Sequence, residues 1–477
     1  MAHRQRPPGR AGEPRVPRTA IVWFTRDLRV HDQPALTAAV AEGGPVLALF
    51  VLDERILGSR YAAANRLSNL LDALHDLRAA LRERGGELVV RRGDPITELR
   101  GLARTVEAGS LHASRDVSGF ARAREGALEA LGRELGVPVT LHPGVTLVEP
   151  FAITASGGGA FRVFTPYWRR WFVHERPSPL AAPTRVPRPV EVGDGAGAAV
   201  PAGPIPDLSE LTDGATAPEL ARGGERAARE RLAWWLDGPL DRYATGRNEL
   251  GVDATSRLSP HLHLGTLSAA EVASHLDPVR EDHLTFLQEL CWRDFNHQLL
   301  AARPDLVRED FRSQGDRWRD DVDAFVAWRE GRTGYPIVDA GMRQLLVEGF
   351  MHNRARMIVA SFLTKHLYLD WRLGAWHFMD HLVDGDLANN FAQWQWSAGT
   401  GTDSRPNRIF NPVTQGERYD PDGAYVRRFV PELADLEPKR IHAPWERVSL
   451  LDPVPDYPPP LVDHREARER FLTARGR

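Results

Sequence analysis

Cysteine and lysine are almost missing from this chain of 477 residues. The single cysteine, Cys291, excludes an internal disulfide and any zinc or iron–sulfur site built from several thiolates. Only Lys365 and Lys439 are lysine among 61 basic residues, so candidates for Schiff-base chemistry are few. The sequence also lacks the G-x-x-x-x-G-K phosphate loop and, after its first apolar run, the G-x-G-x-x-G fingerprint. A P-loop site and a usual nicotinamide site are therefore not expected.

Long apolar runs are absent as well. No stretch approaches the roughly 18 apolar residues that span a bilayer, and residues 1–18 contain no apolar run like that of a signal peptide. We therefore expect a soluble, cytoplasmic protein that does not associate with membranes. We also expect a monomer. The net charge of −3 gives no chain-wide signal for nucleic acid, so any DNA-binding surface would be a local patch.

Hydrophobic patterning divides the chain into four parts. Residues 1–18 are rich in arginine, proline and glycine, which predicts a disordered basic tail. Apolar runs alternate with helical spacings over residues 19–150, which predicts an α/β domain with a parallel, five-stranded, Rossmann-like sheet. Residues 151–224, rich in proline, glycine and alanine, predict an interdomain connector. Residues 225–477 combine helical spacing with polar loops, which predicts an all-α domain.

Within the first domain the spacing predicts particular elements. One helix is expected near residues 33–42, and leucines at helical spacing predict another over 67–81, ended by Gly85 and Gly86. Short apolar runs predict strands at 19–24, 46–52, 87–90, near 111 and at 137–141. The repeated strand–helix order is what indicates a parallel sheet covered on both faces.

Bulky aromatic and polar side chains are mixed between Met351 and Asp403. Four of the 13 tryptophans lie between residues 371 and 396, interleaved with Asp, Asn and Arg. An ordinary core avoids this mixture, because a buried polar group without a partner costs about 1–3 kcal/mol. The stretch therefore predicts a wall around a flat ligand with polar edges. Aromatic helices with solvated acidic loops are the alternative.

A helix start is predicted inside the run from Thr255 to Pro260. Pro260 suits the first helical position and Ser259 suits the cap, and free backbone N–H groups at such a start attract anions. A pyrophosphate would fit there. An ordinary helix cap is the other interpretation.

Glu289, Trp292 and Arg293 are spaced to share one face of a helix. An acid, an aromatic plate and a guanidinium together suit a nucleobase, which they would hold by stacking and by hydrogen bonds to its edge. A surface salt bridge beside a core tryptophan is the alternative interpretation.

His377 and His381 lie one helical turn apart, with Asp384 just beyond, a spacing found in metal sites. No second cluster and no known zinc pattern accompanies them. We therefore expect no metal site.

Seven motifs in a fixed order resemble the photolyase/cryptochrome family, and most nearly its class I cyclobutane pyrimidine dimer photolyases. The resemblance begins near Ile21, includes Trp23 and Phe24, and extends to about residue 470. The motifs occupy residues 255–259, 289–293, 333–340, 351–357, 384–386, 394–396 and 408–412. Ordered motifs over most of a chain are far more specific than any single one.

The resemblance implies that the helical domain holds a U-shaped FAD. Tyr243 and residues 255–259 would line its phosphates, and the other positions would surround the flavin. The full predicted set is Tyr243, Thr255, Ser256, Arg257, Leu258, Ser259, Asn353, Arg356, Asp384, Asp386 and Asn390. Arg356 and Asp384 are expected to form a charge-assisted pair. Asn390 is the residue type of photolyases at a position that is typically Asp in plant cryptochromes.

The implied activity is light-driven repair of cyclobutane pyrimidine dimers in UV-damaged DNA, in which excited, reduced FAD donates an electron to a flipped-out dimer. The lesion would be held by Glu289, Trp292, Asn353, Met357 and Trp396. A cryptochrome-type photoreceptor without repair activity is the alternative. Repair of the (6-4) photoproduct is disfavoured, since it needs a histidine where this chain has asparagine and methionine.

The resemblance also assigns DNA contacts and an electron relay. Residues expected to meet DNA are Arg247, Arg293, Arg354 and Gln415. The relay that photoreduces oxidised flavin would run from Trp394 through Trp371 to Trp318 at the surface.

An antenna chromophore is expected in the amino-terminal domain. Residues 116–122 lack the Asn-Glu pair typical of folate-binding members and are more similar to the deazaflavin-binding members. We therefore predict 8-hydroxy-deazaflavin, with methenyltetrahydrofolate as the alternative. Phe350, and the form of residues 389–393, depart from the commoner family pattern.

Overall fold

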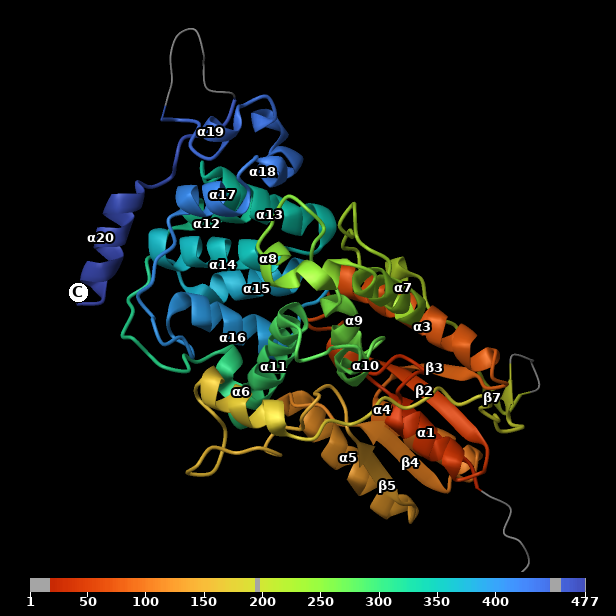
Figure 1. Ribbon diagram of the computed structural model, residues 1–477. Helices are drawn as coiled ribbons and strands as arrows, with labels where there is room; N and C mark the ends of the chain where they lie inside the picture. Colours follow the sequence, from red (N-terminus) through yellow and green to blue (C-terminus); the bar gives the residue numbers. More distant parts are fainter. Residues whose placement is uncertain (1–17, 194–197, 447–455, 477) are drawn as a thin grey trace, which may run out of the picture.

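The computed structural model describes residues 18–193, 198–446 and 456–476. The tail predicted at residues 1–18 lies outside the described residues except for Arg18. Figure 1 shows a sheet with its helices at one end of the molecule and a larger group of helices at the other.

The sheet is parallel throughout, with strand order β3-β2-β1-β4-β5. Every residue of the three strands β1, β2 and β4 is buried, and β1 and β2 are nearly continuous apolar sequences. The strands are β1 Ala20–Phe24, β2 Val46–Asp53, β3 Leu88–Gly93, β4 Ser110–Ser114 and β5 Val139–His142. The prediction of a parallel five-stranded sheet is confirmed.

Helices cover both faces of this sheet. Helices α1 (Pro34–Ala41) and α3 (Ala64–Arg82) pack on one face, and α4 (Pro95–Thr105) and α5 (Gly119–Leu135) pack on the other. Helix α3 contains the predicted leucine stripe, with its leucines turned into the core. The short helix α2 (Glu54–Leu57) follows β2 directly.

Residues 151–224 contain more regular structure than the predicted connector. Helix α6 (Phe164–Val173) packs against helix α11 (Glu281–Ala302), where Trp171 Nε1 donates to Asp294 Oδ2 at 2.9 Å. Two short strands, β6 (Val192–Gly193) and β7 (Val200–Pro201), pair with each other. Helix α6 was not predicted, because the surrounding segment is rich in proline and glycine and is typical of a connector.

The remaining residues are helical, which confirms the predicted fold class. The elements of this half, apart from α11, are α7 Gly224–Leu236, η2 Pro239–Arg242, α8 Tyr243–Gly246, α9 Ser259–Leu264, α10 Ala269–Ser274, η3 Pro304–Val307, α12 Val322–Arg329, α13 Pro336–Glu348, α14 Asn353–Ser361, the π-helix η4 Phe362–His366, α15 Trp371–His381, α16 Leu387–Ala398, α17 Pro412–Tyr419, α18 Ala424–Phe429, η5 Pro431–Leu433, α19 Pro438–Ile441 and α20 His464–Ala474. None of the described helices has the length and apolar content needed to cross a membrane.

Two arginines of the sheet half reach the turn that precedes α16. Arg66 on α3 donates to Leu382 O at 3.0 Å, and a Cβ at Gly385 would lie 2.6 Å from Arg66 Nη1. Arg26, in the loop after β1, donates to Asp386 Oδ2 at 2.7 Å. The carboxyl edge of the sheet therefore helps to fix the start of α16.

Candidate functional site

The carboxylate of Asp384 joins three predicted site residues. Its Oδ2 accepts hydrogen bonds from Ser259 Oγ at 2.5 Å and from Arg356 Nη2 at 2.8 Å. The predicted Arg356–Asp384 pair is therefore present. Asp384 Oδ1 is buried and has no hydrogen-bond partner among the described residues. A buried carboxylate oxygen without a donor is costly, so this atom could accept a hydrogen bond from a ligand.

Asp386 caps helix α16 and is held from the sheet half. Its Oδ1 accepts from Asn389 N at 2.9 Å, and its Oδ2 accepts from Arg26. Burial raises the pKa of Asp386, but His297, His263 and Arg26 outweigh burial and keep the pKa well below its usual value. Asp386 is therefore a charged N-cap that fixes the direction of α16.

Helix α16 carries Asn390 and Trp394, one turn apart. Asn390 is buried and donates from Nδ2 to Ala375 O at 2.9 Å. Trp394 is also buried, and its ring meets those of Phe378 and Trp328 edge-on, with centroid distances of 5.0 and 6.0 Å. Both predicted residues thus sit on a helix whose start is fixed by the Asp384–Asp386 turn.

The loop of residues 255–259 is held in an unusual backbone conformation. Arg257 has φ +50°, in the region that favours glycine, and donates to Glu348 Oε2 at 3.1 Å. Arg231 donates to the carbonyl oxygens of Thr255 and Ser256. The predicted cap by Ser259 is wrong, because α9 begins at Ser259 and the hydroxyl bonds Asp384 instead.

Tyr243 and Leu258 form the apolar support of this loop. Both are buried in the same core cluster, and Tyr243 packs edge-on against Phe286 with ring centroids 5.1 Å apart. Ser256 is buried as well. Residues 255–259 thus lead into α9, where Ser259 contacts the Asp384 carboxylate, and Tyr243 shares the core cluster of Leu258.

Glu289 on α11 is paired with another predicted residue. Arg247 Nη1 donates to Glu289 Oε1 at 2.8 Å. Burial raises the pKa of Glu289, and the charges of Arg247 and Arg354 oppose that rise. The side chain keeps 34% of its surface exposed, so it is available as an acceptor at a solvent-facing edge.

Trp292 stacks on a residue that the sequence reading missed. The ring of Phe164, from α6, lies parallel to Trp292 with centroids 3.6 Å apart and an interplanar angle of 3°. Phe164 belongs to the segment read as a connector, and nothing in its local spacing linked it to α11. The pair forms a flat aromatic unit between α6 and α11.

Arg293 does not share the exposure of Glu289. Its guanidinium donates to the carbonyl oxygens of Val145 and Leu262, and only 12% of the side chain is exposed. Little of it is left to meet a phosphate. The position of Arg293 therefore does not support the predicted DNA contact.

Helix α14 presents Asn353, Arg354 and Met357. Asn353 is exposed and Met357 is half-buried, with its sulfur 3.8 Å from Arg354 Nη1. Arg354 is held by Asn248 Oδ1 at 2.5 Å and lies over the Tyr419 ring at 4.4 Å. Tyr419 ends α17, which brings the α14 and α17 side chains to one surface.

Two further predicted residues lie near that surface. Gln415 is half-buried on α17. Trp396 is half-buried at the end of α16, and the guanidinium of Arg408 lies 5.0 Å from its ring centroid. The family motif contains Arg408, but the sequence reading gave it no role.

The second and third tryptophans of the predicted relay, Trp371 and Trp318, have different surroundings. Trp371 is fully buried and donates from Nε1 to Asp310 Oδ1 at 3.0 Å. Trp318 is half-buried and contacts Tyr368, with ring centroids 5.1 Å apart. Burial therefore decreases along the predicted route from Trp371 to Trp318.

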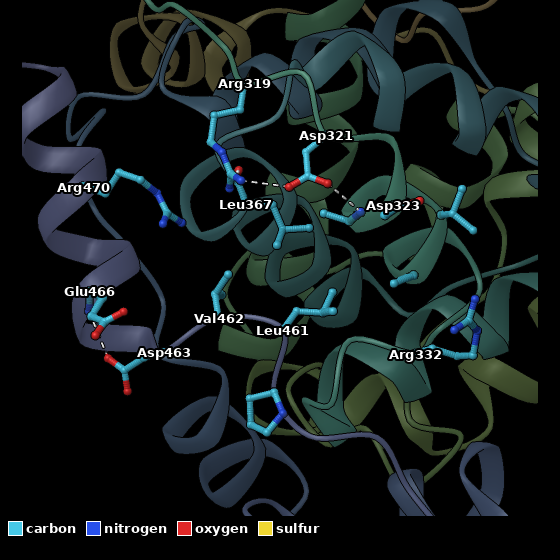
Figure 2. A pocket seen from close by; sticks show the side chains of 14 residues that line it. Arg319, Asp321, Asp323, Arg332, Leu367, Leu461, Val462, Asp463, Glu466 and Arg470 are labelled. Atoms are coloured by element: carbon cyan, nitrogen blue, oxygen red, sulfur yellow. Dashed lines mark hydrogen bonds and ion pairs between the residues drawn. The ribbon is translucent and has the colours of Figure 1, made fainter.

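The pocket in Figure 2 lies elsewhere, between α12, α20 and residues 460–463. Its volume is about 760 Å³, and none of the predicted site residues lines it. Its cations are already engaged: Arg319 with Asp321 at 2.8 Å, and Arg470 with His366 O at 2.6 Å. We assign it no ligand.

The described residues bring together no group of three His, Cys, Asp or Glu side chains able to hold a metal ion. His377 and His381 contact each other, with ring centroids 4.6 Å apart. Asp384, by contrast, is engaged with Ser259 and Arg356.

Comparison with known proteins covers nearly the whole chain. Residues 20–187 match the family model described as DNA photolyase, and residues 286–477 match the FAD binding domain of DNA photolyase. A deoxyribodipyrimidine photo-lyase of Streptomyces griseus is 50% identical over 466 residues, covering 96% of this chain and 99% of the relative.

Two solved structures have the same fold. A bacterial class III photolyase from Agrobacterium tumefaciens superposes with a TM-score of 0.89 at 38% identity, covering 98% of each chain. A Synechocystis cryptochrome superposes with a TM-score of 0.86 at 30% identity, covering 97% of this chain and 100% of the other. The class I subtype expected from the motifs stays a prediction.

Proposed function

The chain belongs to the photolyase/cryptochrome family, and from that membership we propose that it repairs cyclobutane pyrimidine dimers in UV-damaged DNA under blue light. The observation that carries the proposal is the Asp384 carboxylate, which bonds Ser259 and Arg356 through one oxygen and leaves the other buried without a donor. An unpartnered acceptor beside an arginine supports a bound group with a polar edge at this place.

The residues present fit FAD. Asp384 would accept a hydrogen bond from the flavin edge, Arg356 would complete the charge beside it, and the start of α9 would face the phosphates. Bound FAD, when reduced and excited by light, supplies the electron that opens the cyclobutane ring. The work left to the protein is to orient the cofactor and the lesion and to exclude water.

Five side chains would form the lesion socket. Glu289, held by Arg247, would accept hydrogen bonds from the pyrimidine edge. Trp292, backed by Phe164, and Trp396, backed by Arg408, would form its aromatic walls. The remaining members, Asn353 and Met357, would contact the dimer from α14. Extrusion costs a few kcal/mol, and less for a damaged, poorly stacked pair.

Arg247, Arg354 and Gln415 would meet the DNA backbone. The Asn248 bond and the Tyr419 ring hold Arg354 in place before DNA arrives, so less side-chain entropy is lost on binding. Because phosphate contacts release counterions, affinity should fall as salt rises.

We also propose the relay Trp394–Trp371–Trp318 for photoreduction of oxidised flavin, and an antenna in the sheet domain. The motif match around residues 116–122 supports 8-hydroxy-deazaflavin over methenyltetrahydrofolate. Asp116 in that segment is already paired with Arg26 at 3.2 Å, so the antenna would use other groups there.

Repair of defined lesions tests the proposal. Chemically reduced protein would be mixed with an oligonucleotide that carries one thymine dimer, illuminated with blue light, and followed by the return of thymine absorbance. The proposal predicts a gain in the light and none in the dark. A gain only with a (6-4) photoproduct would contradict the proposed substrate. No gain with either lesion would favour a cryptochrome-type photoreceptor, and the Synechocystis neighbour is itself named a cryptochrome.

A further inference from the structure

Residues 399–411 connect α16 to α17, and the structure, which describes all of them, places no helix or strand there. In this loop the guanidinium of Arg408 lies 5.0 Å from the Trp396 ring centroid, and Arg408 Nη2 lies 3.8 Å from Oδ2 of the buried Asp403. Connections of this length without regular structure are uncommon in compact domains and often carry function. Because Trp396 is a proposed wall of the lesion socket, the position of the loop bears on the shape of the socket.

Arg475, the residue after α20, bonds this loop through its guanidinium. Its Nη2 donates to Ala398 O, at the end of α16, at 2.9 Å. Its Nη1 donates to Pro406 O at 3.3 Å and to Asn407 Oδ1 at 3.2 Å. Its Nε and Nη2 also donate to Asp316, at 2.9 and 2.6 Å. These bonds use every N–H group of the planar guanidinium, so Arg475 ties the beginning of the loop to its far part.

Lys365, from the π-helix η4, bonds the same loop at Arg408. Its Nζ donates to Arg408 O at 2.5 Å, and the residue is only 3% exposed. A buried cation is costly, and an apolar side chain of similar length would pack there without that cost. Turns of π-helix are rare and are found mostly at functional sites. The placement of Lys365 therefore has a reason beyond filling the core.

Phe471 of α20 joins the two cations. Its ring is fully buried, with Arg475 Cζ 4.7 Å and Lys365 Nζ 5.9 Å from the ring centroid. Cation–π attraction favours both positions. Helix α20 contacts η4 and lies at the edge of the helical half (Figure 1). We call Lys365, Phe471 and Arg475 the clasp.

We propose that the clasp positions the Arg408–Trp396 wall of the lesion socket, by fixing the backbone of the 399–411 loop before DNA binds. The proposal rests on the lesion socket proposed above. Lys365 and Arg475 are positioning residues in this role, because they act through Arg408. A wall that is already in place loses less conformational entropy when the dimer enters, so the clasp strengthens dimer binding.

The competing explanation is that these contacts only attach α20 to the domain. Loss of a clasp residue would then change stability, but not the motion of the loop or the preference for damaged DNA. Lys365→Met is the most informative variant. It removes the bond to Arg408 O, keeps the length of the side chain and leaves no carboxylate without its hydrogen-bond partner, because that partner is a carbonyl.

The first experiment is hydrogen–deuterium exchange of the protein in the dark without DNA. Arg408 N donates to Arg405 O at 3.0 Å within the loop, so opening of the loop exposes this amide to exchange. In Lys365→Met, peptides that cover residues 399–411 should exchange about tenfold faster than in wild type. Arg475→Lys keeps a charge for Asp316 but has fewer donors, and should act in the same direction. Unchanged exchange in both variants would overturn the proposal.

Arg343→Lys is the matched control for Arg475→Lys. Arg343 also bonds a loop carbonyl, Gly331 O at 3.0 Å, and pairs with a carboxylate, Glu432 at 2.7 Å. It belongs to α13 and contacts none of the clasp residues in these bonds. Exchange of the 399–411 loop should therefore stay at the wild-type rate in this variant.

The second experiment measures DNA affinity in the dark by fluorescence anisotropy, with one oligonucleotide that carries a thymine dimer and the same oligonucleotide undamaged. Lys365→Met should weaken dimer binding about five- to tenfold and leave undamaged DNA within about twofold, because the phosphate contacts remain. Repair per absorbed photon at saturating DNA should also stay within about twofold. A faster loop with an unchanged dimer preference would contradict the positioning role.

A double-mutant cycle tests whether Lys365 acts through Arg408. Arg408→Met removes the side chain that the clasp is proposed to position. In that background Lys365→Met should weaken dimer binding no further, whereas independent residues would give additive losses. Additive losses would contradict the proposal.

The wild type separates this proposal from the proposed function. A wild type without preference for dimer DNA would contradict repair of dimers, and the exchange experiment would still judge the clasp. A wild type that prefers dimer DNA, with variants that exchange and bind as it does, would contradict the clasp and leave the proposed function standing.

Discussion

The first two strands of the sheet and the surroundings of helix α16 bury different kinds of side chain. Strands β1 and β2 are wholly buried, and only the last residue of β2, Asp53, carries a charge. Around α16, by contrast, Asp384, Asp386 and Asn390 are all buried. Packing alone does not require such residues, because each polar group must find a partner or cost about 1–3 kcal/mol. The buried polar groups around α16 lie within the residues that match the FAD binding domain of DNA photolyase.

Two buried carboxylates, Asp27 in the sheet half and Asp384 in the helical half, differ in how many of their oxygens accept hydrogen bonds. In the sheet half, Asp27 is 3% exposed and both of its oxygens are used: Oδ1 accepts from Thr25 N at 2.7 Å, and Oδ2 accepts from Gln33 Nε2 at 2.6 Å and Ser114 Oγ at 2.7 Å. In the helical half, Asp384 leaves Oδ1 without a partner among the described residues. The described partners of Asp27 all belong to the fold, whereas we propose that Asp384 Oδ1 accepts a hydrogen bond from the flavin.

The largest expected effect is loss of flavin from Asp384→Asn. A hydrogen bond to a charged group contributes about 1.5–3 kcal/mol, so FAD affinity should fall roughly ten- to hundredfold. The ratio of flavin absorbance to protein absorbance after gel filtration measures the bound FAD. Asp27→Asn is the matched control and should unfold more easily while keeping its flavin. Equal flavin content in the two variants would break the comparison.

Glu289→Ala should have the next largest effect. Repair yield should fall roughly tenfold, because a charged hydrogen-bond acceptor at the pyrimidine edge is removed, while flavin remains bound. Repair per absorbed photon, with flavin content measured alongside, checks it. Unchanged repair would show that the Glu289–Arg247 pair only stabilises the surface.

Trp394→Phe should affect the photoreduction of the flavin but not the repair of the lesion. Photoreduction of oxidised flavin should stop, because phenylalanine is too hard to oxidise to pass on the electron. Repair by chemically reduced protein should stay close to wild type. The loss of flavin absorbance under light measures photoreduction. The return of thymine absorbance measures repair. Fast photoreduction in this variant would reveal another route.

The last prediction concerns the pH dependence of stability and Lys365, which is buried in the helical half and has no lysine counterpart in residues 18–150. Burial lowers its pKa from 10.5 to about 7. Between these values the unfolded chain binds the extra proton, so this residue makes the unfolding free energy rise with pH, by up to about 1.4 kcal/mol per pH unit. Denaturant titrations of wild type and Lys365→Met should diverge across this window. Parallel pH profiles would contradict the assignment.

The sheet was predictable because its signals are local. Strands β1 and β2 are uninterrupted apolar runs, and the α3 leucines recur at one helical spacing, so a short window of sequence contains the information. Helix α6 was not predicted, because its aromatic face is short and lies in a segment rich in proline and glycine. The motifs located the residues around α16 because they resemble a known family.

The site contacts that were missed join distant segments. Phe164 stacks on Trp292 from 128 residues away, and Arg26 reaches Asp386 across 360 residues. The Ser259 hydroxyl donates to the Asp384 carboxylate and does not cap its own helix. Arg293 turned from the predicted DNA surface to two backbone carbonyls. Local spacing gives a residue's face on its own helix, but the partner on that face depends on how the helices pack.

The absorption spectrum of the purified protein tests the central claim most directly, namely that the buried polar groups around Asp384 enclose a flavin. After incubation with FAD and removal of free pigment, the account predicts flavin bands that stay with the folded protein in a ratio near one per chain. A folded protein that elutes with only its tryptophan and tyrosine absorption would contradict it.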